Sequence, residues 1–230
     1  MSMQACLFLA GARPLANVHA LRRHAADIHG LRQLIVHESM DRAVDPRIAA
    51  PSDAPSWVLQ WYFDELAPVE AALRAEGPIG RALDAAHDMR AEGITQQVMA
   101  VRTLRPAAFT PAKEHDERCT YLVEYEGPAE DLNAWLAHYL LHHPPLMLQL
   151  PALRELEIYT RMDCTSGLRY AHATAMQRNK VAFDDAGALA RALASPVRDA
   201  MRRDFHALPP YRGASPHFAM RSTYGNLAAD

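Results

Sequence analysis

The feature that most constrains this chain is an internal repeat of one helical segment. The stretch LNAWLAHYLLHHPPLMLQLP occupies residues 132–151, and a segment of similar pattern occupies residues 18–36, 114 positions earlier. The matched pairs are His24 with His138, His29 with His143, and Leu21 with Trp135. Each segment is predicted to be a helix ending at its last histidine, and the later one to break at Pro144-Pro145 before a strand. The repeat therefore predicts a duplicated fold.

The periodicity of apolar residues predicts the same order of elements on both sides of a polar linker at 106–116. In the N-terminal half, 1–106, strands are expected at 5–11, 32–40, 57–63 and 95–104, and helices at 17–29 and 64–83. In the C-terminal half, 117–230, strands are expected at 118–126, 155–162, 177–183 and 217–224, and helices at 129–143 and from 184 for about 20 residues. This is the β-α-β-β-α-β order of a ferredoxin-like unit, twice.

Local signals support these boundaries. Asn17 is expected to cap the first helix and Gly30 to end it. Breaks are expected at Gly77-Pro78 and Ser195-Pro196 inside the later helices, and residues 45–55 are expected to form a proline-rich loop. Further matches between the halves keep an offset of 114 to 120, among them Phe63-Asp64 with Phe183-Asp184, Leu73 with Leu193, and 100–103 with 219–222.

A ferredoxin-like unit covers one face of its antiparallel sheet with helices and leaves the other face bare. In a tandem repeat the natural partner for that bare face is the sheet of the other half. We therefore expect an α+β fold in which two fused ferredoxin-like repeats pack their sheets into one barrel.

Composition narrows the class of protein. Half of the residues are apolar and 22% are charged, as in ordinary soluble domains, and the net charge of −3 with no basic stripe gives no case for nucleic acid. Three widely spaced cysteines, Cys6, Cys119 and Cys164, favour a reducing cytoplasm over a disulfide framework. The short apolar start suits a strand rather than a signal peptide, and no run approaches the ~20 apolar residues of a membrane span.

The segments at 18–31, 132–151 and 181–196 make the chain resemble the dimeric α+β barrel superfamily, and within it the EthD-type group. Members of that group tend to carry a helix ending in His-His-Pro-Leu, then Leu-Pro, a Phe-Asp entry to the second helix and a Ser-Pro break within it. The C-terminal half fits better, because the N-terminal half has Gly30-Leu31 in place of a proline and a long loop at 45–55. The superfamily hosts monooxygenases, isomerases, lyases and haem-handling proteins, so fold alone decides little.

His143 is the first candidate for catalysis, and His29 is its counterpart. A histidine at a helix end can act as a general acid or base near neutral pH, or simply cap the last carbonyl groups. His138 and His142 have the i, i+4 spacing of metal ligands. No third ligand is identifiable, so no metal site is predicted, and His138 and His24 are kept as substrate-binding candidates. An axial haem histidine stays open, although no sequence feature requires one.

Aromatic and basic residues complete the candidate site. Trp135 and Tyr139 could line a pocket for a planar substrate or pack in the core. The same two alternatives hold for Trp57, Trp61 and Tyr62 on the strand at 57–63, where alternation puts Trp57 and Trp61 on one face and Tyr62, a substrate-binding candidate, on the other. Arg102 and Arg221 occupy equivalent positions in the closing strands, where they could stabilise an anionic intermediate or form structural salt bridges. His217, Tyr211 and Arg178 are lesser candidates near strand ends.

The chain has no GxSxG, P-loop, GxGxxG or HExxH motif and no Cys-His nucleophile pair, which favours chemistry without an organic cofactor. The resemblance implies a lyase or isomerase of aromatic-compound catabolism, acting on an aromatic, lactone or polyketide-like intermediate. A cofactor-free monooxygenase and a non-catalytic EthD-like binding or accessory protein are the alternatives. His143→Ala is expected to abolish activity and His29→Ala only to weaken it. A homodimer of the fused chain stays open.

Overall fold

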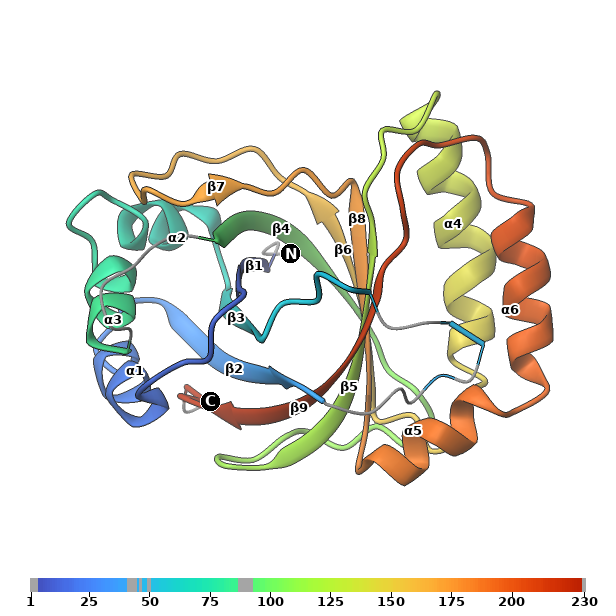
Figure 1. Ribbon diagram of the computed structural model, residues 1–230, viewed down its shortest axis with the longest axis horizontal. Coiled ribbons are helices and arrows are strands. Elements are labelled where there is room, and N and C mark those ends of the chain that lie inside the picture. The colour runs from blue at the N-terminus through green and yellow to red at the C-terminus, as the bar shows by residue number, and fades with distance from the viewer. Residues whose placement is uncertain (1–3, 41–44, 46, 49–50, 87–92, 229–230) are drawn as a thin grey trace.

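Eight antiparallel strands close into a barrel in this computed structural model, which describes residues 4–40, 45, 47–48, 51–86 and 93–228 (Figure 1). The first half supplies β1 (Ala5–Gly11), β2 (Leu31–Ser39), β3 (Trp57–Phe63), β4 (Ile94–Leu104), α1 (Val18–Ala25), α2 (Leu66–Ala72) and α3 (Pro78–Ala86). The second half supplies β5 (Glu117–Tyr125), β6 (Glu155–Arg161), β8 (Gln177–Phe183), β9 (His217–Gly225), α4 (Leu132–Met147), α5 (Ala186–Leu193) and α6 (Val197–His206). A two-residue strand, β7 (Ala171–His172), pairs in parallel with β4.

Each half forms a four-stranded sheet, and the two sheets join at both edges. The hydrogen-bonded order is β4-β1-β3-β2 in the first half and β9-β5-β8-β6 in the second. The antiparallel pairs β2–β9 and β4–β6 connect the sheets and close the barrel. Because every one of the eight strands has a neighbour on each side, the barrel presents no long free edge.

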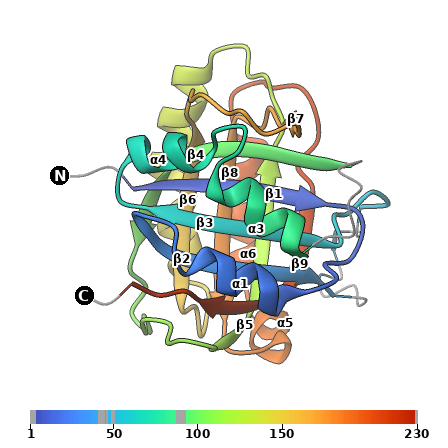
Figure 2. The same cartoon turned by 90° about the vertical axis from the view of Figure 1, so that its left-hand side faces the viewer.

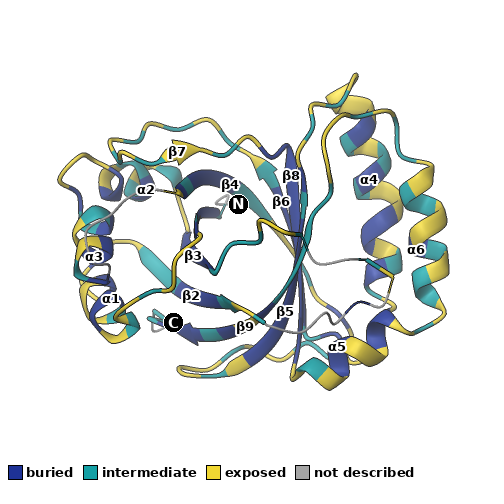
Figure 3. Cartoon of the chain, in the orientation of Figure 1, coloured by how far each residue is buried: buried dark blue, intermediate teal, exposed yellow. Residues whose placement is uncertain are grey.

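Helices cover the outside of the barrel on two opposite sides. Helices α1–α3 lie against the first-half strands, and α4–α6 lie against the second-half strands (Figures 1 and 2). The strands are consequently buried on both faces, and every residue of β3 is buried (Figure 3). Trp57 and Trp61 pack under the helices while Tyr62 faces the barrel interior, so the predicted alternation along this strand is confirmed.

The barrel interior contains an apolar cluster and a charged one. Lys180, which is 1% exposed, lies 3.0 Å from Glu155 Oε2 and 2.8 Å from Glu157 Oε2. Arg118 pairs with Glu155, and Tyr62 donates to Glu157 Oε2 at 2.7 Å. Burial alone would lower the pKa of Lys180, but the two carboxylates outweigh it and raise that pKa well above its ordinary value. The charges in this cluster therefore balance inside the barrel.

Most predicted elements are confirmed, and β1, β3 and β8 have the predicted bounds. Asn17 Oδ1 caps α1 by accepting from Ala20 N at 2.8 Å. The helices predicted to break at Gly77-Pro78 and near Ser195-Pro196 are found as the pairs α2–α3 and α5–α6. Residues 46, 49 and 50 of the predicted loop lie outside the described residues.

Two predicted helix ends are wrong. Helix α1 ends at Ala25 rather than near position 29, and Gly30, with φ +77°, turns the chain where a Cβ atom would lie 2.8 Å from Pro68. Helix α4 does not break at Pro144-Pro145 but continues to Met147. Pro144 and Pro145 cannot donate to the carbonyl groups of Leu140 and Leu141, yet the helix continues past them, and Leu148 N closes its last turn on the Pro144 carbonyl at 2.9 Å.

None of the helices in the described part of the chain has the length and apolar character to cross a bilayer.

Replacing Lys180 with methionine should destabilise the protein by about 3–5 kcal/mol, because it leaves buried carboxylates without their cation. Glu38→Gln, which removes an exposed ion pair with Arg221, should cost less than about 1 kcal/mol. Urea unfolding of both variants measures the difference. Equal, small losses would show that the Lys180 cluster does not hold the barrel together.

The free energy of unfolding should also decrease as the pH is lowered, because of His37. Its ring lies between Ser222 Oγ at 2.6 Å and Gln60 Oε1 at 2.8 Å. Burial, helped by the charge of Lys180, lowers the pKa of His37 from 6.5 to about 3. As the pH falls, His37 is therefore protonated in the unfolded chain before it is protonated in the folded protein. Between pH 6.5 and about pH 3 the free energy of unfolding decreases by roughly 1.4 kcal/mol per pH unit. His37→Gln should show a shallower slope in urea unfolding at acid pH, and an unchanged slope would contradict the assignment.

Candidate active site

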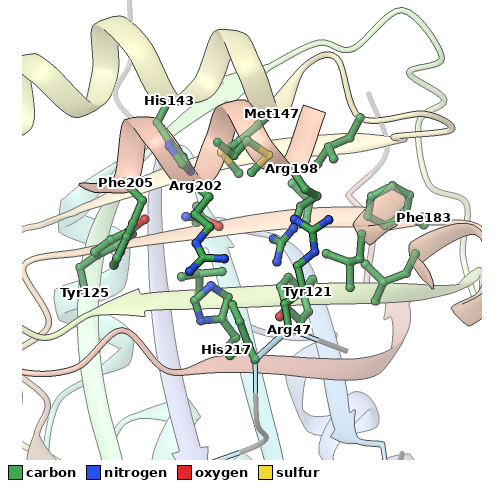
Figure 4. A pocket seen from close by; sticks show the side chains of 18 of the residues that line it. Arg47, Tyr121, Tyr125, His143, Met147, Phe183, Arg198, Arg202, Phe205 and His217 are labelled. Atoms are coloured by element: carbon green, nitrogen blue, oxygen red, sulfur yellow. The ribbon is translucent and has the colours of Figure 1, made fainter. Parts of the chain in front are cut away.

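A pocket of about 280 Å³ lies between the outer face of the second-half sheet and helices α4–α6 (Figure 4). Its polar side chains come from three directions: His143 from α4, Arg198 and Arg202 from α6, and Tyr121 and His217 from the sheet. Arg47 and Ile48, from the connection between β2 and β3, add a contribution from the first half. Tyr125, Asn179 and His206 also line the pocket, and the remaining side chains are apolar, among them Met147, Val181, Leu189 and Phe205.

Regular spacing brings these side chains to the pocket. On α6, Arg198, Met201, Arg202 and Phe205 recur at three- and four-residue intervals, so they share one face. On β5, Tyr121, Val123 and Tyr125 alternate toward the helices. The pocket is therefore a gap in the layer between helices and sheet, outside the barrel.

His143 forms the central polar contact of the pocket. Its Nδ1 lies 2.7 Å from Asp204 Oδ2 on α6, and the residue is only 6% exposed. An ionised carboxylate can only accept, so Nδ1 carries the hydrogen and Nε2 keeps a lone pair. Burial lowers the pKa of His143, and Asp204 opposes this shift without cancelling it. His143 is thus a neutral base, oriented by a carboxylate, on the pocket wall.

Asp204 also serves a second histidine. His138 Nε2 lies 3.3 Å from Asp204 Oδ1, although that contact is not aligned as a hydrogen bond. The His138 and His142 rings lie 4.6 Å apart on α4, but His142 is exposed. Among the described residues, no three His, Cys, Asp or Glu side chains are grouped to hold a metal ion.

An aromatic stack fixes the position of the His143 ring. Tyr139 lies 5.1 Å from that ring at 29°, and Trp135 stacks on Tyr139 at 5.2 Å and 9°. Asn179 Nδ2 donates to the Tyr139 hydroxyl at 2.8 Å. Trp135 and Tyr139 are fully buried in the core behind His143, so they support the ring without lining the pocket.

Two of the three pocket arginines are paired with carboxylates. Arg198 Nη2 lies 2.7 Å from Asp45 Oδ2, to which the Tyr121 hydroxyl also donates at 2.8 Å. Arg47 pairs with Asp199 at 2.7 Å. Burial, reinforced by the Asp45 carboxylate, raises the pKa of Tyr121 and keeps its phenol protonated. Asp45 comes from the first half, so both halves build this wall.

The predicted site residues fall into three groups. His143 and His217 both line the pocket, and Trp135, His138 and Tyr139 lie directly behind it. The remaining predicted residues lie elsewhere: His24 and His29 are exposed near α1, Arg102 and Arg221 are exposed on outward strand faces, and Tyr62 is inside the barrel. The alternation of side chains along β9 explains the position of Arg221. Met220 and Ser222 face inward, so Arg221 must face outward, where it pairs with Glu38.

Sequence reasoning missed Asp204, Arg198, Arg202 and Asp45. The available signal was the inward face of α6, in which basic and apolar residues alternate at helical spacing. Asp45 had no such signal, since its role depends on a loop from the first half that reaches the second.

The fold is shared with solved structures of very different sequence. No family model and no curated protein matches the chain. An anthrone oxidase-like protein matches with 15% identity and a TM-score of 0.62, covering 100% of this chain and 97% of that one. A proposed monooxygenase of Lactobacillus acidophilus NCFM matches with 8% identity and a TM-score of 0.57, covering 98% of this chain and 96% of that one. These two likenesses show a shared α+β barrel fold, as the sequence predicts.

An EthD-family protein of Bacillus halodurans C-125 also matches, with 24% identity over 42% of this chain and 97% of that one. Its TM-score is 0.33, and a likeness at that level carries no structural conclusion.

Replacing Asp204 with asparagine should lower the pKa of His143 further, because Asp204 is the group that raises it against burial. NMR titration of the His143 ring protons measures the change. Asp199→Asn, on the same helix but exposed, is the matched control and should leave that pKa in place. A His143 pKa that rises or stays constant in Asp204→Asn would refute the pairing.

Proposed function

We propose that the protein is a small enzyme that removes a proton from an apolar, weakly acidic carbonyl or phenolic compound. His143 is the base and Asp204 its orienting carboxylate. The observation that carries the proposal is the 2.7 Å contact between His143 Nδ1 and Asp204 on the wall of an apolar, arginine-lined pocket. A base held in one tautomer, with its other nitrogen available to a ligand, suits general acid-base catalysis.

The charges around the pocket support this step. When His143 takes a proton it becomes a cation, and the adjacent Asp204 stabilises it. The substrate becomes an enolate or phenolate, and the guanidinium groups of Arg198 and Arg202 are the positive charges that can face it. The His143 side chain is buried among apolar neighbours, and this strengthens its interaction with Asp204.

The fate of the anion separates two kinds of enzyme. Return of the proton at another atom gives an isomerase, and loss of a leaving group gives a lyase. Both need only the base and the cations. In the alternative, the anion reduces molecular oxygen, so that a methylene group and O₂ become a carbonyl group and water. The names of the two similar structures, an anthrone oxidase-like protein and a proposed monooxygenase, favour that second candidate.

We also propose that the chain is a fusion of two ferredoxin-like repeats, bounded at 1–106 and 117–230. In support, β1 pairs Ala5 with Phe63, and β5 pairs Cys119 with Phe183, so equivalent residues differ by 114 and 120 positions. The ion pairs Arg32–Asp64 and Arg154–Asp184 lie at similar places in the two halves, with Asp64 and Asp184 again 120 positions apart and the arginines 122 apart. The fused barrel can be complete in one chain, and a homodimer of it remains a proposal.

The alignment of β3 with β8 supports a single working pocket, in the second half. At this offset Trp61 corresponds to Val181, and Leu59 to Asn179. Trp61 is fully buried under the first-half helices, whereas Val181 lines the pocket. In the first half the large Trp61 side chain thus fills the space between sheet and helices. In the second half the smaller Val181 leaves that space open.

His143→Ala should reduce proton exchange at least about 100-fold, the usual contribution of a positioned base. Anthrone and tetralone, apolar ketones with acidic C–H bonds, are suitable probes. Deuterium uptake from heavy water is followed by NMR under argon, and oxygen consumption is followed with an electrode. His142→Ala, one residue away on α4 and exposed, is the matched control and should keep full activity.

Exchange without oxygen consumption would favour the isomerase or lyase, and His143-dependent oxygen consumption would favour the oxygenase. Binding of the probes by the native protein without exchange would replace both with the accessory-protein hypothesis. Full activity in His143→Ala would refute the proposal itself.

A further inference from the structure

His217 presents an unpartnered acceptor to the pocket. Its Nδ1 lies 2.7 Å from the Ser215 carbonyl oxygen, which can only accept, so Nδ1 carries the hydrogen and Nε2 is bare. Among the described residues, no second hydrogen bond is made by this ring. The Tyr121 ring, 5.4 Å away, holds it from one side. Burial lowers the pKa of His217 to about 4, so near neutral pH the ring stays uncharged and Nε2 stays an acceptor.

Arg202 presents an unpaired cation to the same pocket. Arg198 and Arg47 have carboxylate partners, but in the described part of the chain Arg202 forms neither an ion pair nor a hydrogen bond. Figure 4 shows its guanidinium reaching into the pocket from α6, while the His217 ring reaches in from β9. Besides His143 Nε2, the pocket therefore offers one guanidinium group without an ion-pair partner, Arg202, and one further hydrogen-bond acceptor, His217 Nε2.

The other residues that line the pocket indicate the size, shape and polarity of the ligand. Met147, Val181 and Phe205 are apolar, and the pocket volume of about 280 Å³ lies at the small end for ligand sites. A flat, apolar ring system of about two rings suits that space, with polar groups limited to its edges. An acceptor selects a donor, such as a hydroxyl group, and an unpaired guanidinium selects an anion, such as a carboxylate.

We infer that the pocket selects a hydroxylated aromatic acid, whose ring hydroxyl donates to His217 Nε2 and whose carboxylate binds Arg202. This inference rests on the proposed function, because it takes the pocket of His143 as the substrate site. His217 and Arg202 hold the ring by its edges, and His143 remains free for proton transfer. Neutral ketones without these groups bind the same pocket more weakly.

The test compares hydroxynaphthoate, naphthoate and naphthol by titration calorimetry. Hydroxynaphthoate should bind about tenfold more tightly than either of the others, since each lacks one polar contact, and tenfold corresponds to roughly 1.4 kcal/mol. In His217→Phe the preference over naphthoate should disappear. His217→Gln, which keeps an acceptor oxygen, should retain part of it.

Arg202→Gln should abolish the preference over naphthol, and in the native protein that preference should shrink as salt is added. Arg203→Gln is the matched control, because Arg203 is exposed on the same helix but does not line the pocket. It should leave all three affinities unchanged.

Equal affinities for the three probes in the native protein, or equal losses in Arg202→Gln and Arg203→Gln, would overturn the inference. Failure of the proposed function gives a different result. If tetralone exchange still depends on His143 while the three probes bind equally, only the substrate class is wrong. If exchange does not depend on His143, the proposed base is wrong whatever the affinities.

Discussion

The structure depends on the charged cluster around Lys180 at the centre of the barrel. Closing the barrel buries the inner faces of both sheets, and on β6 and β8 those faces carry Glu155, Glu157 and Lys180. Such groups are tolerated in a dry interior only when each finds its counter-charge. Lys180 bridges the two glutamates, and Arg118 from β5 completes the pairing. Tyr62 from β3 joins the cluster by donating to Glu157, so the inner faces of both sheets contribute to it.

The outer layer is where the two halves differ. In the first half, Trp57, Trp61 and Phe63 fill the space under α1–α3 and are at most 1% exposed. In the second half the equivalent strand, β8, carries Val181 and Asn179. Helix α6 places arginines and Asp204 over the pocket that lies there. The first half therefore has a filled core under its helices, and the second half has a lined pocket there. The loop that carries Asp45 and Arg47 ties the filled half to the other half's pocket.

Patterns of period two and of 3.6 made the strands and most helices predictable from the sequence. The strand of Trp57–Phe63 is apolar almost throughout because it is buried on both faces, and its bounds could be read directly. The end of helix α4 could not be predicted, since Pro144 and Pro145 normally end a helix and here the helix runs through both of them to Met147.

Only some residues of the candidate site could be predicted from the sequence. His143 ends a repeated motif, and His217 begins a strand, so both could be proposed as candidates. Asp204 and Arg202 could not, because the distance from α6 to α4 and across the pocket is a property of tertiary packing. Arg221 and Arg102, which were predicted from their equivalent positions, lie on outward strand faces and do not line this pocket. One residue of strand register decides whether a side chain points inward or outward.

The most direct test of this account is the tautomer of His143, observed by NMR of protein labelled with ¹⁵N in its histidine rings. The account predicts a hydrogen on Nδ1, toward Asp204, and a bare Nε2 near neutral pH, with protonation of Nε2 when an acidic ligand fills the pocket. A hydrogen on Nε2 in the free protein, or a ring that does not respond to such a ligand, would contradict it.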